Sequence, residues 1–123
     1  MNLTELKILI RNVPDFPKKG IQFKDITTIL QNPVAFNFVI DSFFNNCESK
    51  KIDKIVGIES RGFIFGAPLA LKLNLPFVIA RKPGKLPHKT VSQEYELEYG
   101  NDSLEIHEDS IQENENVLII DDL

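Results

Sequence analysis

The chain has 123 residues, 42% hydrophobic and 26% charged, which is typical of one globular domain, and no apolar run approaches the roughly 18 residues of a membrane span. A single cysteine, Cys47, excludes an internal disulfide, and the N-terminus lacks the basic start and cleavage site of a signal peptide, so a reducing cytoplasm fits. All 14 Lys and Arg lie in residues 1–89 while residues 90–123 hold 11 acidic residues, and because the basic residues are scattered without interleaved aromatics, nucleic-acid binding is disfavoured.

The N-terminal third predicts two helices with a break between them. Residues 4–13 have the apolar spacing of a short amphipathic helix, and two prolines and a glycine in residues 13–20 end it. Residues 21–23 are too few to assign. Asn32-Pro33 combines an N-cap acceptor with a proline suited to the first turn, so a second helix is expected to run from there to about Cys47, itself a small apolar residue on that helix.

The middle of the chain predicts a strand–helix–strand unit. Residues 55–58 form a short β-branched run typical of a buried strand, and a polar turn follows at residues 59–62. Apolar and small residues then recur at helical spacing from Phe63 to about Asn74. The apolar run 75–80 predicts a second strand, parallel to the first because a helix connects the two.

The C-terminal third predicts a hairpin and a third strand. Residues 89–99 and 103–107 alternate in polarity, with Gly100-Asn101-Asp102 expected as the turn between them. Residues 116–122 predict another buried strand, which ends in two carboxylates. The expected fold class is therefore α/β, a parallel sheet flanked by helices with a β-hairpin, in a single domain over residues 1–123.

Charged residues follow all three predicted parallel strands. They are Glu59-Ser60-Arg61, Arg81-Lys82 and Asp121-Asp122. In open α/β sheets, ligands bind beyond the carboxyl ends of the strands, and a strand–turn–helix points backbone N–H groups at an anion. Gly62 and Gly66 would let a ligand or a neighbouring strand come close. One such turn alone could be an ordinary βα turn with a surface arginine, but the three together predict a phosphorylated ligand with a divalent cation.

The run Val117–Leu123 resembles the first half of the phosphoribosyl-pyrophosphate signature of type I phosphoribosyltransferases. Five further segments stand in the order seen in the adenine phosphoribosyltransferase family: residues 13–17, 20–26, 59–63, 81–87 and 97–100. The resemblance covers nearly the whole chain. It implies transfer of a 5-phosphoribosyl group from phosphoribosyl pyrophosphate to N9 of adenine, giving AMP and pyrophosphate with Mg²⁺, in a protein that is by default a homodimer.

The resemblance also implies roles for the residues at the strand ends. Arg61 and the backbone of Ser60–Gly62 would hold the pyrophosphate, where charge grows during the reaction. Arg81, Lys82 and Lys85 would add cations. Asp121 and Asp122 would lie near the ribose hydroxyls, and Mg²⁺ would bridge substrate oxygens. The alternative for the two aspartates is a strand end that caps a helix.

For the base, residues 20–24 resemble the family's adenine-binding segment, in which backbone groups read the purine edge and Phe23 stacks on it. Phe23 could equally be a core aromatic. Gln22 and Lys24 stand where close relatives often carry an apolar residue and an arginine, and neither change should matter if the backbone does the reading.

Glu98 and Tyr99 resemble residues of the family's mobile hood. Glu98 would manage the proton on the purine nitrogen as a general acid or base. The alternative is one more acidic residue on a solvated hairpin. His88 and His107 lack metal-ligand spacing and are expected to be isolated surface residues.

The chain departs from the family at its end. Leu123 directly follows the two aspartates, whereas the family's signature continues into a loop rich in threonine and glycine that wraps the 5′-phosphate. The expectation is that the C-terminal part of the fold is missing, that residues 1–123 alone do not turn over, and that the exposed last strand makes them poorly soluble.

Two other functions compete with the first. One is a phosphoribosyltransferase for hypoxanthine, xanthine or orotate, which the segment 13–26 and the Glu-Tyr-Gly hood disfavour. The other is a regulator on the same fold that binds phosphoribosyl pyrophosphate and then a nucleic acid. Such a regulator needs an added helix-turn-helix or a concentrated basic face, and the predicted N-terminal helix is too short for the former.

Overall fold

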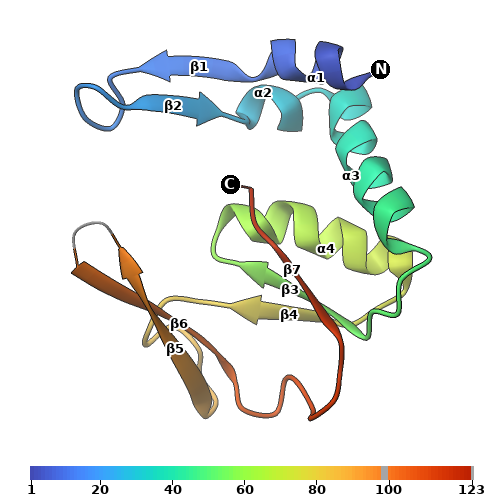
Figure 1. The fold of residues 1–123 in the computed structure, drawn as a ribbon, viewed down its shortest axis with the longest axis vertical. Helices are drawn as coiled ribbons and strands as arrows, with labels where there is room; N and C mark the ends of the chain where they lie inside the picture. The colour runs from blue at the N-terminus through green and yellow to red at the C-terminus, as the bar shows by residue number, and fades with distance from the viewer. Residues whose placement is uncertain (98–99, 123) are drawn as a thin grey trace. The chain divides into compact units, whose positions relative to one another are not determined.

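The computed structural model describes residues 1–97 and 100–122 (Figure 1). They fall into two compact units, Met1–Phe43 and Phe44–Leu123. Within the described ranges, no helix has both the length and the apolar character needed to span a membrane.

The first unit begins with helix α1, Leu3–Leu9, and a two-stranded antiparallel ribbon of β1, Arg11–Pro14, and β2, Gln22–Asp25. A capping box starts α1, because the Asn2 Oδ1 accepts the Glu5 N–H at 2.9 Å and a Glu5 carboxylate oxygen accepts the Asn2 N–H at 2.8 Å. The prediction of one helix over residues 4–13 was wrong beyond Leu9. Val13 instead pairs with Phe23, and the backbone from Arg11 onwards forms its hydrogen bonds with β2.

Two more helices follow the ribbon. Helix α2, Thr27–Leu30, is a single turn, and α3, Pro33–Cys47, runs across the boundary between the two units. The predicted start of α3 is confirmed, since the Asn32 side chain accepts the Ala35 N–H at 3.1 Å. Cys47 is buried at the end of α3, as expected for a small apolar residue.

The second unit is built on a parallel sheet in the order β4-β3-β7, with β3, Lys54–Ile58, at its centre. Helix α4, Arg61–Leu73, connects β3 to β4, Phe77–Ala80, so the predicted parallel strand–helix–strand unit is confirmed. The helix starts at Arg61, two residues before Phe63, and ends at Leu73. Asn74 follows it with a φ of 56°, the left-handed conformation common after a helix.

The core of this unit lies between α4 and the sheet, where Ile55 and Leu69 are fully buried. The Phe77 ring fills the space left by two glycines. A Cβ on Gly57 or on Gly66 would lie 2.6 Å from a ring carbon of Phe77. Gly66 therefore serves the close approach of a neighbouring strand, one of the two purposes predicted for it.

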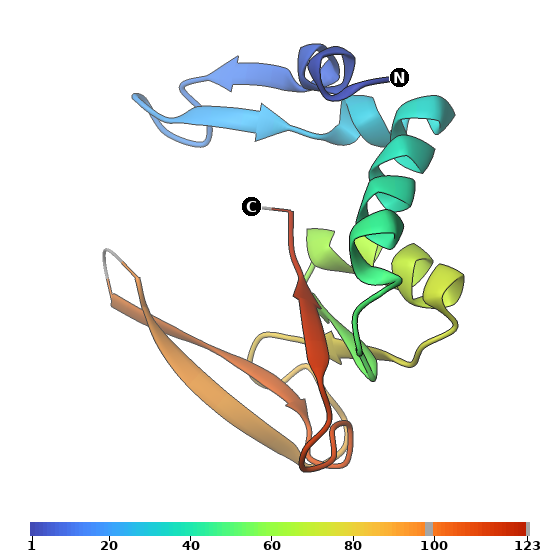
Figure 2. The ribbon, with the colours of Figure 1, turned by 45° about the vertical axis from the view of Figure 1, so that its right-hand side comes forward.

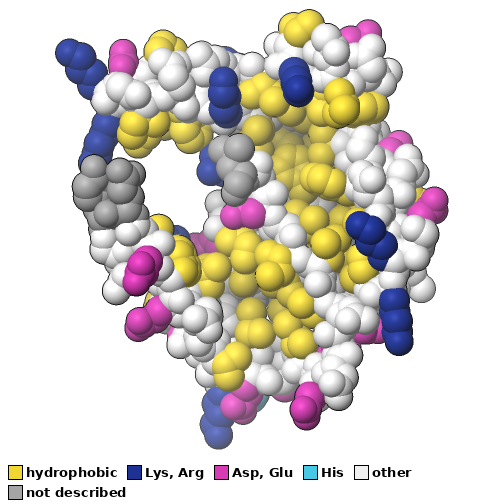
Figure 3. Space-filling view, viewed as in Figure 1, with side chains coloured by type: hydrophobic (Ala, Val, Ile, Leu, Met, Phe, Trp, Pro, Cys, Tyr) yellow, Lys and Arg dark blue, Asp and Glu magenta, His cyan; other side chains and the backbone are white. Residues whose placement is uncertain are grey.

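Strand β7, Val117–Ile120, lies at the edge of the sheet and is covered on one face. Ile120 is buried, but Ile119 is 61% exposed and Val117 37% exposed, so the prediction of a buried strand was wrong for the face that carries these two residues. The open face borders an apolar groove of ≈ 420 Å³ that includes Val56 and Ile106. Figure 3 shows hydrophobic side chains gathered over the region of β7.

Strands β5, Thr90–Leu97, and β6, Gly100–His107, form the predicted hairpin, which extends from the sheet as a long twisted ribbon (Figure 2). The predicted turn was wrong. Residues 100–102 belong to β6, and Asp102 pairs with Tyr95, because the ladder continues further along both strands than the turn-forming residue types suggest. Arg81 and Glu105 exchange backbone hydrogen bonds of 2.9 and 2.8 Å, which join the hairpin to the end of β4.

The two histidines are not isolated as predicted. The His88 N–H donates to Nε2 of His107 at 3.3 Å, and the two rings meet edge to face with centroids 5.7 Å apart. His107 ends β6 and His88 precedes β5, so strand pairing brings together two residues that are far apart in sequence.

Candidate active site at the carboxyl ends of the parallel strands

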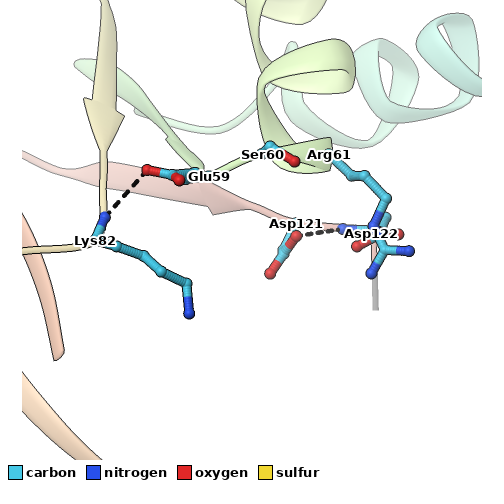
Figure 4. A pocket seen from close by; sticks show the side chains of 6 residues that line it. All are labelled: Glu59, Ser60, Arg61, Lys82, Asp121 and Asp122. Carbon is cyan, nitrogen blue, oxygen red and sulfur yellow. Dashed lines mark hydrogen bonds and ion pairs between the residues drawn. The ribbon is translucent and has the colours of Figure 1, made fainter. Parts of the chain in front are cut away.

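A pocket of ≈ 360 Å³ opens at the carboxyl ends of the parallel strands (Figure 4). Its lining residues are Glu59, Ser60, Arg61, Lys82, Asp121 and Asp122. Five of these six were predicted as site residues, and Glu59 was not. The side chains of Lys82 and Asp121 extend toward the same open space (Figure 4). We call this cavity the strand-end pocket.

The pocket forms here because β3 and β7 are parallel neighbours, so the residues that follow them meet at one edge of the sheet. The start of α4 also lies tight against the end of β7. A Cβ on Gly62 would stand 2.5 Å from the carbonyl oxygen of Ile120, so only glycine allows this approach. The Glu59–Ser60 peptide between β3 and α4 is cis.

An ion pair joins the first turn of α4 to the residue pair after β7. Arg61 Nε lies 2.8 Å from Oδ2 of Asp122, whose side chain is only 4% exposed. Burial raises the pKa of the Asp122 carboxyl, Arg61 acts against that rise, and the neighbouring Asp121 adds to it. Asp121 Oδ1 accepts the Asp122 N–H at 2.9 Å.

The N-terminus of α4 provides a second source of positive potential. The first amides of any helix lack intrahelical acceptors and carry the positive end of its dipole. The Ser60 side chain makes no capping hydrogen bond within the described residues. The start of this 13-residue helix therefore suits an anion in the pocket.

The Glu59 carboxylate contacts the cationic side chains and a backbone N–H of the segment that follows β4. Its Oε1 accepts the Arg81 Nε–H at 3.0 Å and the Lys82 backbone N–H at 3.1 Å, and its Oε2 lies 3.7 Å from Lys85 Nζ. The Lys82 N–H, and after it Arg81, hold the pKa of the Glu59 carboxyl below its usual value despite burial. Arg81 and Lys85, both predicted site residues, thus contact a wall of the strand-end pocket without lining it.

Lys82 connects the pocket to the hairpin. Its Nζ donates to Oδ2 of Asp102 on β6 at 2.7 Å, and this contact raises the pKa of Lys82 and lowers that of Asp102. Burial, and after it Asp102, raises the pKa of the Tyr95 hydroxyl on the paired strand β5. Glu59 was predicted only as one of the charged residues that follow a parallel strand, with no role of its own, and Asp102 was predicted only as part of a turn.

The predicted adenine-binding residues lie on β2 in the first unit. The Phe23 ring meets Phe16 edge to face, 5.1 Å between centroids, beside a pocket of ≈ 230 Å³. Asn12 on β1 donates to the Gln22 side chain at 2.8 Å and accepts from Lys24 at 3.2 Å. Because side chains alternate along a strand, Gln22 and Lys24 lie on the face of β2 opposite Phe23.

The two predicted hood residues, Glu98 and Tyr99, lie outside the described residues. The ladder on either side of them is described, with Leu97 of β5 paired to Gly100 of β6.

Comparison with known proteins identifies the family. Residues 25–123 match the phosphoribosyl transferase domain family. Over all 123 residues the chain is 57% identical to an adenine phosphoribosyltransferase of Thermoanaerobacter pseudethanolicus and spans 71% of it. Over 119 residues it is 60% identical to that of Brachyspira hyodysenteriae, covering 97% of this chain and 70% of the relative.

Solved structures agree. The crystal structure of the Thermoanaerobacter pseudethanolicus adenine phosphoribosyltransferase matches with a TM-score of 0.94 at 56% identity, over 98% of this chain and 70% of that one. The Saccharomyces cerevisiae adenine phosphoribosyltransferase, complexed with an imino-altritol bisphosphate and adenine, matches with a TM-score of 0.91 at 46% identity, over 97% and 70% of the two chains. The predicted fold class is confirmed, and the chain belongs to the adenine phosphoribosyltransferases.

Proposed function

We propose that the strand-end pocket binds phosphoribosyl pyrophosphate and that its sugar is transferred there to adenine. The bond from C1′ to the pyrophosphate oxygen breaks, a bond from C1′ to N9 of adenine forms, and N9 loses its proton. The supporting observation is the convergence, around ≈ 360 Å³, of a helix N-terminus, two cationic side chains and three carboxylates.

The pyrophosphate belongs with the positive groups of the pocket. Arg61 and the first amides of α4 would donate hydrogen bonds to its oxygens, and Lys82 would contact them from the end of β4, with Arg81 and Lys85 adding positive potential. Negative charge on these oxygens grows as the C1′–O bond breaks. Donors already fixed in place stabilise that charge without reorganising, which lowers the barrier.

The sugar belongs with the carboxylates. Asp121 is exposed to the pocket, and its oxygens can accept hydrogen bonds from ribose hydroxyls. A negative group beside the ring also favours the positive charge that develops on the sugar as the leaving group departs. Asp122, nearly buried and paired with Arg61, would act mainly by orienting that guanidinium.

The pocket chemistry fits Mg²⁺ as a partner of the substrate. Carboxylate oxygens suit this hard cation, which keeps several waters and binds through one or two carboxylates plus phosphates. Among residues 1–97 and 100–122, no three acidic, histidine or cysteine side chains form a metal-binding group. We therefore infer that Mg²⁺ would be held chiefly by substrate oxygens, with Asp121 and Asp122 nearby, and that it would neutralise pyrophosphate charge.

The resemblance of residues 20–24 assigns the base to the β1–β2 ribbon. Backbone groups of residues 20–24 would read the purine edge and Phe23 would stack on its face. Glu98 would accept the N9 proton as a general base, and Tyr99 would help to close the hood over the reacting atoms. A closed hood excludes water, which would otherwise hydrolyse the activated sugar.

The test is formation of AMP from adenine and phosphoribosyl pyrophosphate by the purified full-length gene product, with hypoxanthine and orotate assayed separately as control bases. We expect product from adenine alone, and we expect Lys82→Gln to raise the KM for phosphoribosyl pyrophosphate more than the KM for adenine. Equal turnover of orotate would contradict the assignment of the base. Unchanged kinetics in Lys82→Gln would contradict the assignment of the pocket.

We also infer a homodimer and a cytoplasmic location, because both are usual for soluble enzymes of nucleotide metabolism. Light scattering on the purified protein would give its mass in solution, and a mass of two chains is expected. Recovery in the soluble cell fraction, separate from membranes, would test the location.

A further inference from the structure

A carboxylate is an unexpected wall for a pocket that suits an anion, yet Glu59 lines the strand-end pocket. On charge alone it would repel pyrophosphate. Its side chain is only 14% exposed and is occupied by groups from the segment after β4. The role of Glu59 therefore depends on its contacts with the segment after β4 and not on contact with an anion.

Glu59 ties two strand ends together twice. Its backbone N–H donates to the Ala80 carbonyl at 2.9 Å, which extends the β3–β4 pairing by one residue. Its carboxylate then accepts from the Lys82 N–H and from Arg81 Nε. This fixes the direction in which the chain leaves β4, and so the point from which the Lys82 side chain enters the pocket.

We propose that Glu59 is a positioning residue for pyrophosphate binding, acting through Arg81 and Lys82. The proposal rests on the proposed function, in which these cations serve the pyrophosphate. A positioning role and simple electrostatics predict opposite changes in pyrophosphate affinity when the Glu59 charge is removed. Removing a negative charge beside an anion site should tighten binding by Coulomb's law, whereas removing a positioning residue should weaken it because the cations lose their fixed geometry.

The sign of the effect can be measured with inorganic pyrophosphate as the probe, by titration calorimetry on the wild type and Glu59→Gln. Glutamine keeps the size of the side chain but loses the charge that holds Arg81 and Lys85. We expect binding about fivefold weaker, which corresponds to the net loss of about one ordinary hydrogen bond. In steady state, KM for phosphoribosyl pyrophosphate should rise while kcat changes by less than about twofold.

Glu115→Gln is a matched control. Glu115 also pairs with a lysine, Lys54 Nζ at 2.9 Å, and accepts the Gln112 backbone N–H, but it precedes β7 at the opposite end of the sheet. The Glu115→Gln substitution removes one negative charge from the same unit, as Glu59→Gln does, but at a position away from the strand-end pocket. We expect its pyrophosphate affinity to equal that of the wild type.

A second readout does not depend on the substrate. In the unliganded protein, the Lys82 amide and Arg81 Nε–H resonances should titrate with the Glu59 carboxyl, at a pH below the usual glutamate range. Both resonances should lose this titration in Glu59→Gln and keep it in Glu115→Gln. Glu59→Asp retains the charge but shortens the side chain, so its affinity for pyrophosphate should lie between those of the wild type and Glu59→Gln.

The outcomes separate the two proposals. Equal or tighter pyrophosphate binding by a folded Glu59→Gln would overturn the positioning role. If the wild type binds neither pyrophosphate nor phosphoribosyl pyrophosphate, the proposed function fails at this pocket. In that case, the positioning role would be overturned as well if the Lys82 and Arg81 resonances do not titrate with the Glu59 carboxyl. If Glu59→Gln does not fold, affinity in Glu59→Asp as strong as in the wild type would overturn it.

Discussion

Gly62 and Gly66 lie one turn apart on α4 and face different obstacles. A Cβ at Gly62 would meet a backbone oxygen, that of Ile120, whereas at Gly66 it would meet the edge of the Phe77 ring. A backbone atom cannot move aside without shifting a strand, but a ring can tilt. Alanine at Gly66 also gains helix propensity of up to about 1 kcal/mol, which offsets part of the overpacking.

We therefore expect Gly62→Ala to lower the free energy of unfolding by about 1–3 kcal/mol and Gly66→Ala by less. Urea unfolding at equilibrium measures both. Gly62→Ala should also weaken pyrophosphate binding, because it pushes the start of α4 away from the strand-end pocket. Equal stability losses in the two variants would show that α4 and β7 are not held this closely.

Asp122 provides a pH prediction. Burial raises its pKa, Arg61 lowers it, and Asp121 raises it further. Arg61→Gln should then raise the Asp122 pKa and Asp121→Asn should lower it, as followed by carboxyl carbon resonances. Shifts of the same sign in both variants would contradict this account of the pair.

The consequence for stability has a definite sign. Because the folded pKa of Asp122 is raised above the usual value of about 3.9, the folded state binds this proton more strongly than the unfolded state does. Its contribution to stability is largest below about pH 3.9 and declines as pH rises through the folded pKa. Asp122→Asn should flatten this part of the stability profile.

At the scale of elements, the β1–β2 ribbon separates the two kinds of residue in the predicted adenine-binding segment. The ladder places Phe23 beside Phe16 and its small pocket, while Gln22 and Lys24 hydrogen-bond to Asn12 on the other face. If the backbone and the Phe23 ring recognise the base, only changes on the Phe23 face should affect adenine.

We expect Phe23→Ala to weaken adenine binding by about 1–3 kcal/mol, the usual value of a base–aromatic stack, and Phe23→Tyr to preserve it. Gln22→Ala and Lys24→Ala are the controls on the opposite face and should change the adenine KM by less than about twofold, since exposed pairs contribute little. If Lys24→Ala weakens adenine binding as much as Phe23→Ala does, then the polar side chains on the opposite face of β2 also recognise the base.

At the scale of the whole molecule, the open face of β7 predicts association. Ile119 is 61% exposed on an edge strand that borders an apolar groove. Exposed apolar surface beside unpaired strand groups is a template for self-association. Sedimentation velocity across a concentration series should show larger species forming, and Ile119→Lys should suppress them with little loss of stability.

Leu71→Lys is the control for this experiment. Leu71 is 82% exposed on α4 and lies outside the groove, so the substitution adds the same charge elsewhere. It should leave association unchanged. If Leu71→Lys suppresses the larger species as strongly as Ile119→Lys, net charge and not the groove governs association.

Residue patterns by themselves determined several local elements and the family. Capping at Asn32-Pro33, the succession of strand, helix and strand around α4, and the charged residues after three strands can each be read from neighbours close in sequence. These patterns reflect local capping and burial periodicity, which a single chain displays without its fold.

Only the tertiary structure decided the features made by distant partners. Val13 leaves its apparent helix because β2 supplies its hydrogen bonds, and residues 100–102 stay in β6 because β5 continues to pair with them. Glu59 meets Arg81 and Lys85 only because parallel strands bring their ends together, and Lys82 meets Asp102 only through the hairpin. The physical reason is that strand pairing and ion pairs form across long sequence separations, where local propensity carries no information.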